Sequence, residues 1–385
     1  MSEYQYYEFV ATDRPLDDRQ LDELRSLSTR AVITRTSFVN EYHWGNFRGD
    51  PLVLMERYFD AFLYLANWGT REVMIRVPAR LLTLDTAQQY LVGDAVSARL
   101  GGDQVILCMT SEDDAGDWEQ GCEGWLSSII PARAELAAGD LRALYLAWLL
   151  SAQTELDDDE IEPPVPPGLG TLTGPLQSLA DFLRIDKDLI AVAATASDQS
   201  PGQLSSDTDL TAWIESIPTA EKNALLLSVV RDDDRHLRAQ LLRRFHDTGS
   251  TRSSVGERTV GQLLATAAAR REARELHAEQ ARAEQAARRQ QQAAIAREKY
   301  LESLAPQEDD VWHRVSTLID TKKPREYDTA VQLLQDLRDL AERRRHSDAF
   351  EQRLTQLCLQ HQRKPSLLQR FDRAGLPAGS VSRAG

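Results

Sequence analysis

The sequence predicts an α+β N-terminal domain, a sheet with helices on one face, followed by an all-α body, a long single helix and a small helical C-terminal module. Three observations predict this class. Residues 1–150 hold 18 of the 26 aromatic residues, which bury the most area per residue and so indicate the best-packed core. Acidic residues, prolines and glycines concentrate at 154–175. Residues 259–304 form a 46-residue run without proline, rich in Ala, Arg, Glu and Gln.

The first domain, residues 1–153, alternates strand and helix patterns. β-branched and aromatic residues favour strands, and we expect them at 4–11, 31–44, 72–77, and as a hairpin at 96–100 and 104–110. The apolar second arm of the hairpin is typical of an interior strand. Apolar residues at helical spacing predict helices, and we expect these at 16–27, 52–66, 85–91 and 141–152. In the second of them the polar residues Glu56, Arg57 and Asp60 fall on one narrow stripe, which is typical of a largely buried helix.

The body begins after an acidic Pro/Gly linker at 154–175, whose composition favours extended, solvated chain. A small helical domain should follow at 176–247. Its helices are expected at 176–183, 187–194, 210–216, 221–230 and 236–245. A Ser/Gly hinge at 248–258 ends this part of the chain.

The long helix at 259–304 would reach roughly 70 Å at ~1.5 Å per residue. Its apolar stripe is mostly alanine and holds no heptad of large residues, which favours a lone helical arm over a tight coiled coil. The C-terminal module, 305–377, should contain two apolar helical stripes and a short final helix with Ser366 as N-cap and Gly375 just past its end. Residues 378–385 are expected to form a disordered tail.

Charge is distributed unevenly. The net charge is −15, but residues 1–250 carry 41 acids against 21 bases, whereas 251–385 carry 19 against 24. An acidic body repels nucleic acid, so any such contact should come from 251–385. The longest apolar run has eight residues, too few for a membrane span, and the N-terminus does not resemble a signal peptide. We therefore expect a cytoplasmic protein without membrane contact. Three scattered cysteines do not form a disulfide framework.

Two stretches resemble an uncharacterised family of bacterial cytoplasmic proteins. The opening block reads Tyr-Gln-Tyr-Tyr-Glu-Phe-Val-Ala-Thr-Asp-Arg-Pro-Leu at 4–16, with Phe-Val-Asn-Glu-Tyr-His-Trp-Gly at 38–45 and Ala-Asn-Trp-Gly at 66–69. The ending reads Lys-Pro-Ser-Leu-Leu-Gln-Arg-Phe-Asp-Arg-Ala-Gly-Leu at 364–376. The resemblance would cover nearly the whole chain and implies a bacterial source, but no activity or catalytic residues.

The densest polar and aromatic cluster lies at 40–48. On a strand, Glu41 and His43 share one face, and a carboxylate beside an imidazole supports acid–base chemistry. One hypothesis is a catalytic site built from Glu41, His43 and Asp60. Another is a ligand site, for which the candidates are Tyr42, Trp44 and Arg48. The alternative is a strand end whose polar groups are satisfied structurally.

Other motifs are few. The sequence lacks G-x-x-x-x-G-K-[ST], H-E-x-x-H, C-x-x-C and G-x-S-x-G, so we expect no cofactor and no metal site. Basic residues in the last third are candidates for nucleic-acid binding, namely Arg343, Arg344, Arg345, Arg363 and Lys364. Aromatic residues for base stacking are sparse there.

Taken together, the sequence favours a non-enzymatic interaction protein, a scaffold or adaptor of a bacterial multi-component system, with another protein or a second copy of itself as partner. One alternative is a nucleic-acid-binding accessory factor that uses 251–385. A second alternative is an enzyme or small-ligand site around His43.

Overall fold

The computed structural model describes residues 4–113, 124–197, 207–231, 237–249 and 258–376. They form two compact units, Met1–Arg274 and Glu275–Gly385, and each is described by itself. The expected fold class is confirmed: an antiparallel sheet with helices is followed by an all-helical remainder that includes one long helix. Residues 114–123 and the tail expected at 378–385 lie outside the described residues.

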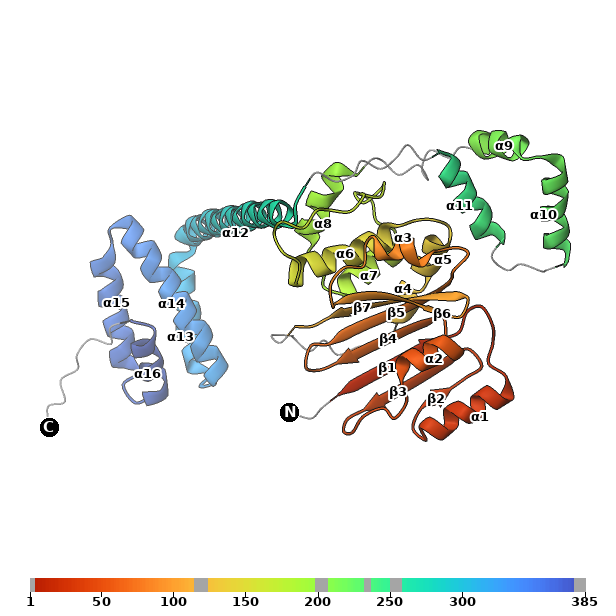
Figure 1. Cartoon of the computed structure of the whole chain (residues 1–385). Coiled ribbons are helices and arrows are strands. Elements are labelled where there is room, and N and C mark those ends of the chain that lie inside the picture. Colours follow the sequence, from red (N-terminus) through yellow and green to blue (C-terminus); the bar gives the residue numbers. More distant parts are fainter. Residues whose placement is uncertain (1–3, 114–123, 198–206, 232–236, 250–257, 377–385) are drawn as a thin grey trace. The chain divides into compact units, whose positions relative to one another are not determined.

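The first unit is built on a seven-stranded antiparallel sheet of order β2-β3-β1-β4-β5-β7-β6 (Figure 1). The strand bounds are β1 Gln5–Val10, β2 Val32–Ile33, β3 Ser37–Tyr42, β4 Ala61–Ala66, β5 Arg71–Pro78, β6 Val96–Gly101 and β7 Gln104–Ser111. The predicted hairpin is β6–β7, and β7 lies inside the sheet, as its apolar sequence indicates. The predicted strand at 31–44 is divided, because a turn closed by Thr34 N–H on Ser37 O separates β2 from β3.

The helix expected at 52–66 is wrong in its second half. The chain is helical only in α2, Pro51–Arg57, and then enters β4 in the middle of the sheet. Both faces of β4 are covered: Leu63 and Leu65 belong to one core, and Phe62 to the other. A strand buried on both faces loses the alternation of apolar and polar residues, so its sequence is not distinguished from that of a buried helix.

Helices cover both faces of the sheet and not one face, as the sequence analysis expected (Figure 1). The larger group packs on the face that carries Leu63, Val73 and Leu107. Its helices are α3 Leu84–Gln88, α4 Trp125–Ile129, α5 Pro131–Ala137, α6 Arg142–Thr154, α7 Gly174–Phe182 and α8 Lys187–Ala193. On the opposite face, α1 (Asp18–Leu27) and α2 close a smaller aromatic core around Phe9. Asp140 lies two residues before α6 and accepts from Arg142 N–H.

The segment 154–175, expected as a solvated linker, is packed in the structure. Val165 and Leu169 lie in the same core as the sheet and α6, and the Glu162 side chain is fully buried. α7 and α8 share this core as well, so no separate helical domain begins at residue 176. Prolines bring no N–H that burial would leave unsatisfied, which makes them suitable for irregular buried chain.

Beyond α8 the chain leaves the core and returns to the same place. Ser197 Oγ donates to Pro166 O, and Arg258 donates to Val192 O and Thr195 Oγ1 at the end of α8. Between these points lie α9 Asp207–Ser216, α10 Thr219–Arg231 and α11 Leu237–Gly249. Most of the hinge predicted at 248–258 lies outside the described residues.

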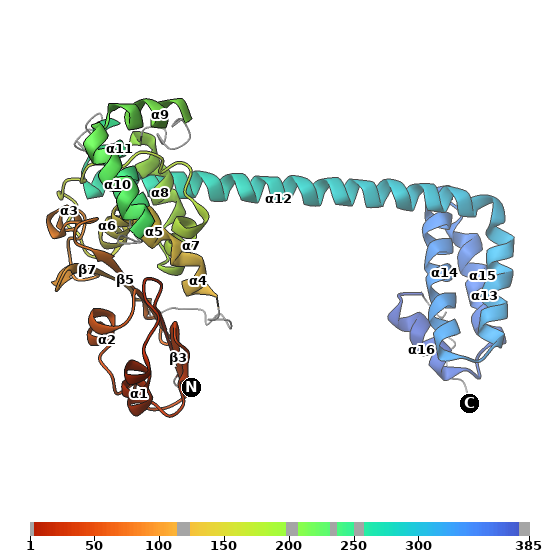
Figure 2. The same ribbon diagram turned by 90° about the vertical axis from the view of Figure 1, so that its right-hand side faces the viewer.

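The long helix is confirmed as α12, Val260–Leu304, one continuous element of 45 residues (Figure 2). Arg258 fixes its start with a bidentate ion pair to buried Glu162, at 2.6 and 2.7 Å, and Val260 and Leu263 enter the core of the first unit. From Ala268 to Tyr300 all side chains are exposed except two that are half-buried. An exposed helix of this length needs the strong helix formers that the sequence supplies.

The second unit has a separate core of its own. The last turn of α12 packs there with four helices, α13 Glu308–Asp320, α14 Pro324–Arg344, α15 Ser347–Gln360 and α16 Pro365–Arg373 (Figure 2). Gly375 follows α16 with φ +67°, as expected of a residue just past a helix end. Ser366 is not the N-cap, because α16 begins at Pro365 and Lys364 occupies that position.

Candidate functional site

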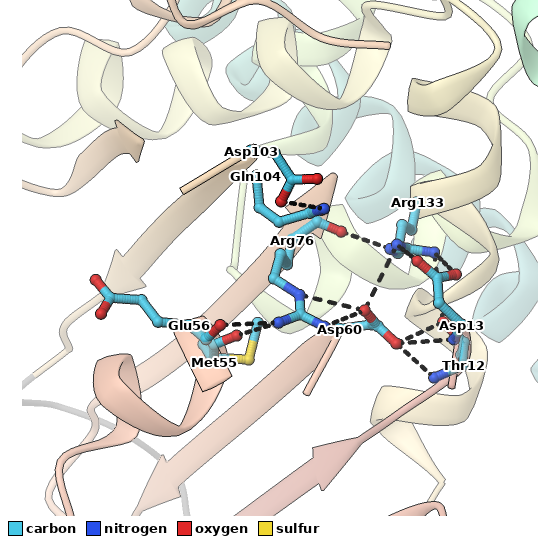
Figure 3. Close-up of polar contacts among 9 residues, drawn as sticks. All are labelled: Thr12, Asp13, Met55, Glu56, Asp60, Arg76, Asp103, Gln104 and Arg133. Atoms are coloured by element: carbon cyan, nitrogen blue, oxygen red, sulfur yellow. Dashed lines mark hydrogen bonds and ion pairs between the residues drawn. The ribbon is translucent and has the colours of Figure 1, made fainter. Parts of the chain in front are cut away.

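Asp60, a predicted catalytic candidate, is the centre of a buried ion-pair network (Figure 3). One carboxylate oxygen accepts from the backbone N–H groups of Thr12 and Asp13 at 2.7 and 2.9 Å. The other accepts from Arg76 Nη2 at 2.8 Å, and Arg133 Nη2 lies 3.6 Å from it. The network joins the end of β1, the α2–β4 connection, β5 and α5.

This arrangement makes Asp60 a structural anchor. Its side chain is 1% exposed, and all its acceptor directions are already in use. Burial raises the pKa of Asp60, but the charge of Arg133, the N–H of Asp13 and Arg76 outweigh it, so the pKa is lowered. A carboxylate that is ionised and fully hydrogen-bonded does not shuttle protons. The catalytic role predicted for Asp60 is therefore not favoured by its surroundings.

The predicted partners of Asp60 lie at the other end of the sheet. Tyr42 pairs with Gln5 at the start of β1, whereas Asp60 N–H bonds to Val10 O at its end. Five residue steps of ~3.3 Å separate these ends by roughly 17 Å. The structure therefore does not bring Glu41 and His43 together with Asp60.

The 40–48 cluster is also divided within itself. β3 ends at Tyr42, so His43 does not continue the strand face that carries Glu41, and both side chains are exposed. Tyr42 is buried, accepts from Asn40 Nδ2 at 2.8 Å and packs edge-on against Tyr7. Its position is that of a core residue, not of a ligand contact.

Exposed aromatic residues do gather at this end of the sheet. Tyr4 packs against the His43 ring at 5.3 Å and exchanges hydrogen bonds with Asn67. The residues that follow His43 and Asn67 in the chain are Trp44, 67% exposed, and Trp68, 46% exposed. The Arg30 guanidinium stacks on Trp44 at 4.3 Å, and Arg48 is exposed in the same loop. Exposed tryptophans of this kind are typical of interfaces.

One polar pair in the sheet was not predicted. Cys108 Sγ lies 3.1 Å from Glu72 Oε1 across β5 and β7. Burial first, then the charge and hydrogen bond of Glu72, raise the pKa of Cys108 from 9.0 to about 12. Burial also raises the pKa of Glu72. A thiol this basic is protonated at neutral pH and is a poor nucleophile, so the pair does not indicate cysteine catalysis.

The predicted nucleic-acid contacts are partly used within the second unit. Arg343 lies 3.5 Å from Glu298, Arg344 3.9 Å from Glu308, and Lys364 Nζ donates to Ile319 O at 3.0 Å. Arg345 ends α14 with φ +57°, and it is exposed, as is Arg363. Residues 305–377 carry 13 bases against 12 acids, so the module has no basic excess. This charge balance does not favour a nucleic-acid surface.

Four exposed large apolar side chains of the first unit lie on α10. Leu226, Leu227, Val229 and Val230 are 63%, 52%, 62% and 82% exposed, and none of the helix residues is buried. Leu226, Leu227 and Val230 share one side of the helix, and we call these three residues the apolar stripe. The half-buried side chains are on the other side, namely Glu221, Lys222, Leu225 and Ser228. Sequence analysis predicted a helix at 221–230 but did not identify its exposed apolar side.

Other site types find little support in the structure. Among the described residues, no three His, Cys, Asp or Glu side chains gather where a metal ion could bind. Throughout the described ranges, none of the helices combines the length and apolar character that crossing a membrane requires. No protein family, curated protein or solved structure matches the chain.

Proposed function

We propose that this protein is a cytoplasmic, non-enzymatic scaffold or adaptor that binds another protein through its first unit. The observation that carries the proposal is the apolar stripe on α10. A helix in water turns its apolar side inwards, whereas α10 exposes three large apolar side chains and places charged Glu221 and Lys222, beside Leu225 and Ser228, on its half-buried side. Contiguous apolar side chains on a monomer surface mark interaction sites, since covering them with a partner removes them from water.

The surroundings of the stripe support a protein partner. α10 contacts both neighbours: Glu221 pairs with Arg244 of α11 at 2.7 Å, and Lys222 Nζ donates to Glu215 O of α9 at 3.1 Å. The rings of Trp213 in α9 and Phe245 in α11 lie 5.5 Å apart. A helix that is held with three large apolar side chains outward resembles one half of a helix–helix interface, with anchors spaced at i, i+1 and i+4. Trp44 and Trp68 offer a second aromatic contact surface on the same unit.

The test is affinity purification of the tagged full-length protein from its host, with and without nuclease, for the wild type and two variants. Leu226→Asp places a charge in the stripe. Leu276→Asp is the matched control, because Leu276 is 54% exposed on α12. We expect a stoichiometric protein partner that resists nuclease, is lost with Leu226→Asp and remains with Leu276→Asp. Retention of every partner by Leu226→Asp, or partners that nuclease removes, would contradict the proposal.

A further inference from the structure

A polar groove runs along the second unit between α13 and α15. It has a volume of about 320 Å³. α13 contributes residues spaced i, i+3, i+4 and i+7, and α15 does the same, so each helix presents one face to the groove. The lining residues are Asp309, Trp312, His313, Ser316, Arg353, Gln356, Leu357 and Gln360.

The floor of the groove is apolar and its walls are polar. Trp312 and Leu357 are 6% and 5% exposed and belong to the core of the unit. The wall residues His313, Gln356 and Gln360 are exposed, and they bring N–H donors to the groove. A groove of this kind suits an occupant that accepts hydrogen bonds.

Arg353 is positioned as an anion-binding residue. Its guanidinium stacks on the Trp312 ring at 5.0 Å, and its Nη1 donates to Asp309 at 2.8 Å across the groove. The Asp309 side chain is 89% exposed and the Arg353 side chain 45%. An ion pair this exposed contributes little to stability, so an incoming carboxylate can replace Asp309 without a large cost. The stack on Trp312 keeps the guanidinium in place during the exchange.

Beyond the opposite end of the groove Arg363 is exposed, whereas Lys364 is engaged by Ile319 O and by Asp320 at 3.5 Å. Arg353 contacts Asp309 near the start of α13, while Lys364, just after α15, contacts Ile319 O near the end of α13. The two helices therefore run in the same direction, and Arg363 and Lys364 follow the Gln360 end. From residue 353 to 363 the rise is about 15 Å at ~1.5 Å per residue. This separation spans several residues of a bound peptide.

We propose that this groove binds an acidic peptide segment of a partner protein, with a side-chain carboxylate on Arg353 in place of Asp309. Glutamine, serine and histidine side chains would bond to the peptide backbone, and the exposed Arg363 would face a further acidic residue. Nucleic acid is the less favoured occupant, because Trp312 is buried below the surface where a base would stack. The proposal is independent of the apolar stripe on α10.

The test is fluorescence anisotropy of a labelled decapeptide of alternating Glu and Ala, titrated with the full-length protein. Arg353→Gln should weaken binding by about tenfold or more, because it removes a charge-assisted contact. Asp309→Asn should strengthen binding by about two- to fivefold, because it removes the internal competitor. Arg370→Gln is the matched control: Arg370 also stacks on an aromatic ring, Tyr327, and pairs with Asp328 at 2.7 Å, but it lies outside the groove.

The opposite sign of the two groove variants separates binding from folding, since no loss of stability explains a gain in affinity. Equal affinities for wild type, Arg353→Gln and Asp309→Asn would overturn the proposal. So would a labelled oligonucleotide that binds more tightly than the peptide in an Arg353-dependent way. If the peptide does not bind the groove but Leu226→Asp loses the natural partner, the groove proposal fails and the proposed function is supported. If the peptide binds as expected but Leu226→Asp keeps the partner, the proposed function fails and the groove proposal is supported.

Discussion

The buried network around Asp60 allows a quantitative prediction of stability. Asp60→Asn keeps the shape of the side chain but replaces one oxygen by an NH2 group. Both oxygens of Asp60 face donors, the N–H groups of Thr12 and Asp13 on one side and Arg76 on the other. In either orientation, the NH2 group of the new amide therefore faces an N–H donor. The buried guanidinium group of Arg76 also loses the negative charge that it pairs with. Breaking a buried ion pair in this way costs about 3–5 kcal/mol.

The expected effect is a fall in the unfolding midpoint of the first unit by about 6–20 °C, at roughly 2–4 °C per kcal/mol for a unit of this size. Thermal unfolding followed by near-UV circular dichroism would measure it. Asp22→Asn is the control, because Asp22 and Arg25 form an ion pair whose side chains are 76% and 61% exposed, and its loss should cost under about 1 kcal/mol. A similar midpoint for both variants would refute the anchor role of Asp60.

The pH dependence of the same variant has a definite sign. The pKa of Asp60 in the folded protein is lowered from its usual 3.8. Its charge therefore stabilises the fold above this value, and the contribution is lost as the pH falls through the lower, folded-state pKa. The difference in the free energy of unfolding between wild type and Asp60→Asn should reach its maximum at pH 6 and should decrease as the pH falls below about 4.

Two further predictions concern the same sheet. Gly69→Ala should destabilise the first unit by about 1–3 kcal/mol, because Gly69 has φ +105° and an added Cβ would lie 1.8 Å from Asp113 O; a chemical-denaturation midpoint equal to that of the wild type would contradict this. Cys108 in the native protein should react with iodoacetamide at pH 8 about a thousandfold more slowly than an ordinary thiol, since its pKa is raised from 9.0 to about 12. Peptide mass spectrometry would follow the labelling, and rapid modification of Cys108 without unfolding would show that the thiol is not held as described.

The sequence predicts best the helices and strands that are determined by their own residues and do not depend on contacts with distant parts of the chain. α12 begins within one residue of expectation because alanine and charged helix formers specify a helix without tertiary help. β4 was missed because the burial of both its faces is a property of the assembled sheet. The packing of the segment around Val165 is not predicted for a related reason. Its proline-rich composition indicates an extended conformation, but it does not show that other parts of the fold bury the segment.

The candidate sites show a similar limit. Glu41, His43 and Asp60 were grouped by proximity in the sequence, but register places Asp60 at the far end of β1. The α13–α15 groove needs two helices 44 residues apart in the sequence to run side by side, which no single-helix pattern contains. The outward apolar side of α10 was equally hidden, because amphipathic sequence fixes which residues share a face and leaves the direction of that face open.

The return of the chain to its departure point at α8 has a consequence for how this protein can change over generations. Ser197 and Arg258 both lie beside the end of α8, so residues 198–257 begin and end at neighbouring points of the first unit. Insertions and deletions there need not shift the register of any strand. The exposed side chains of α10 can therefore change without altering the sheet or the start of α12.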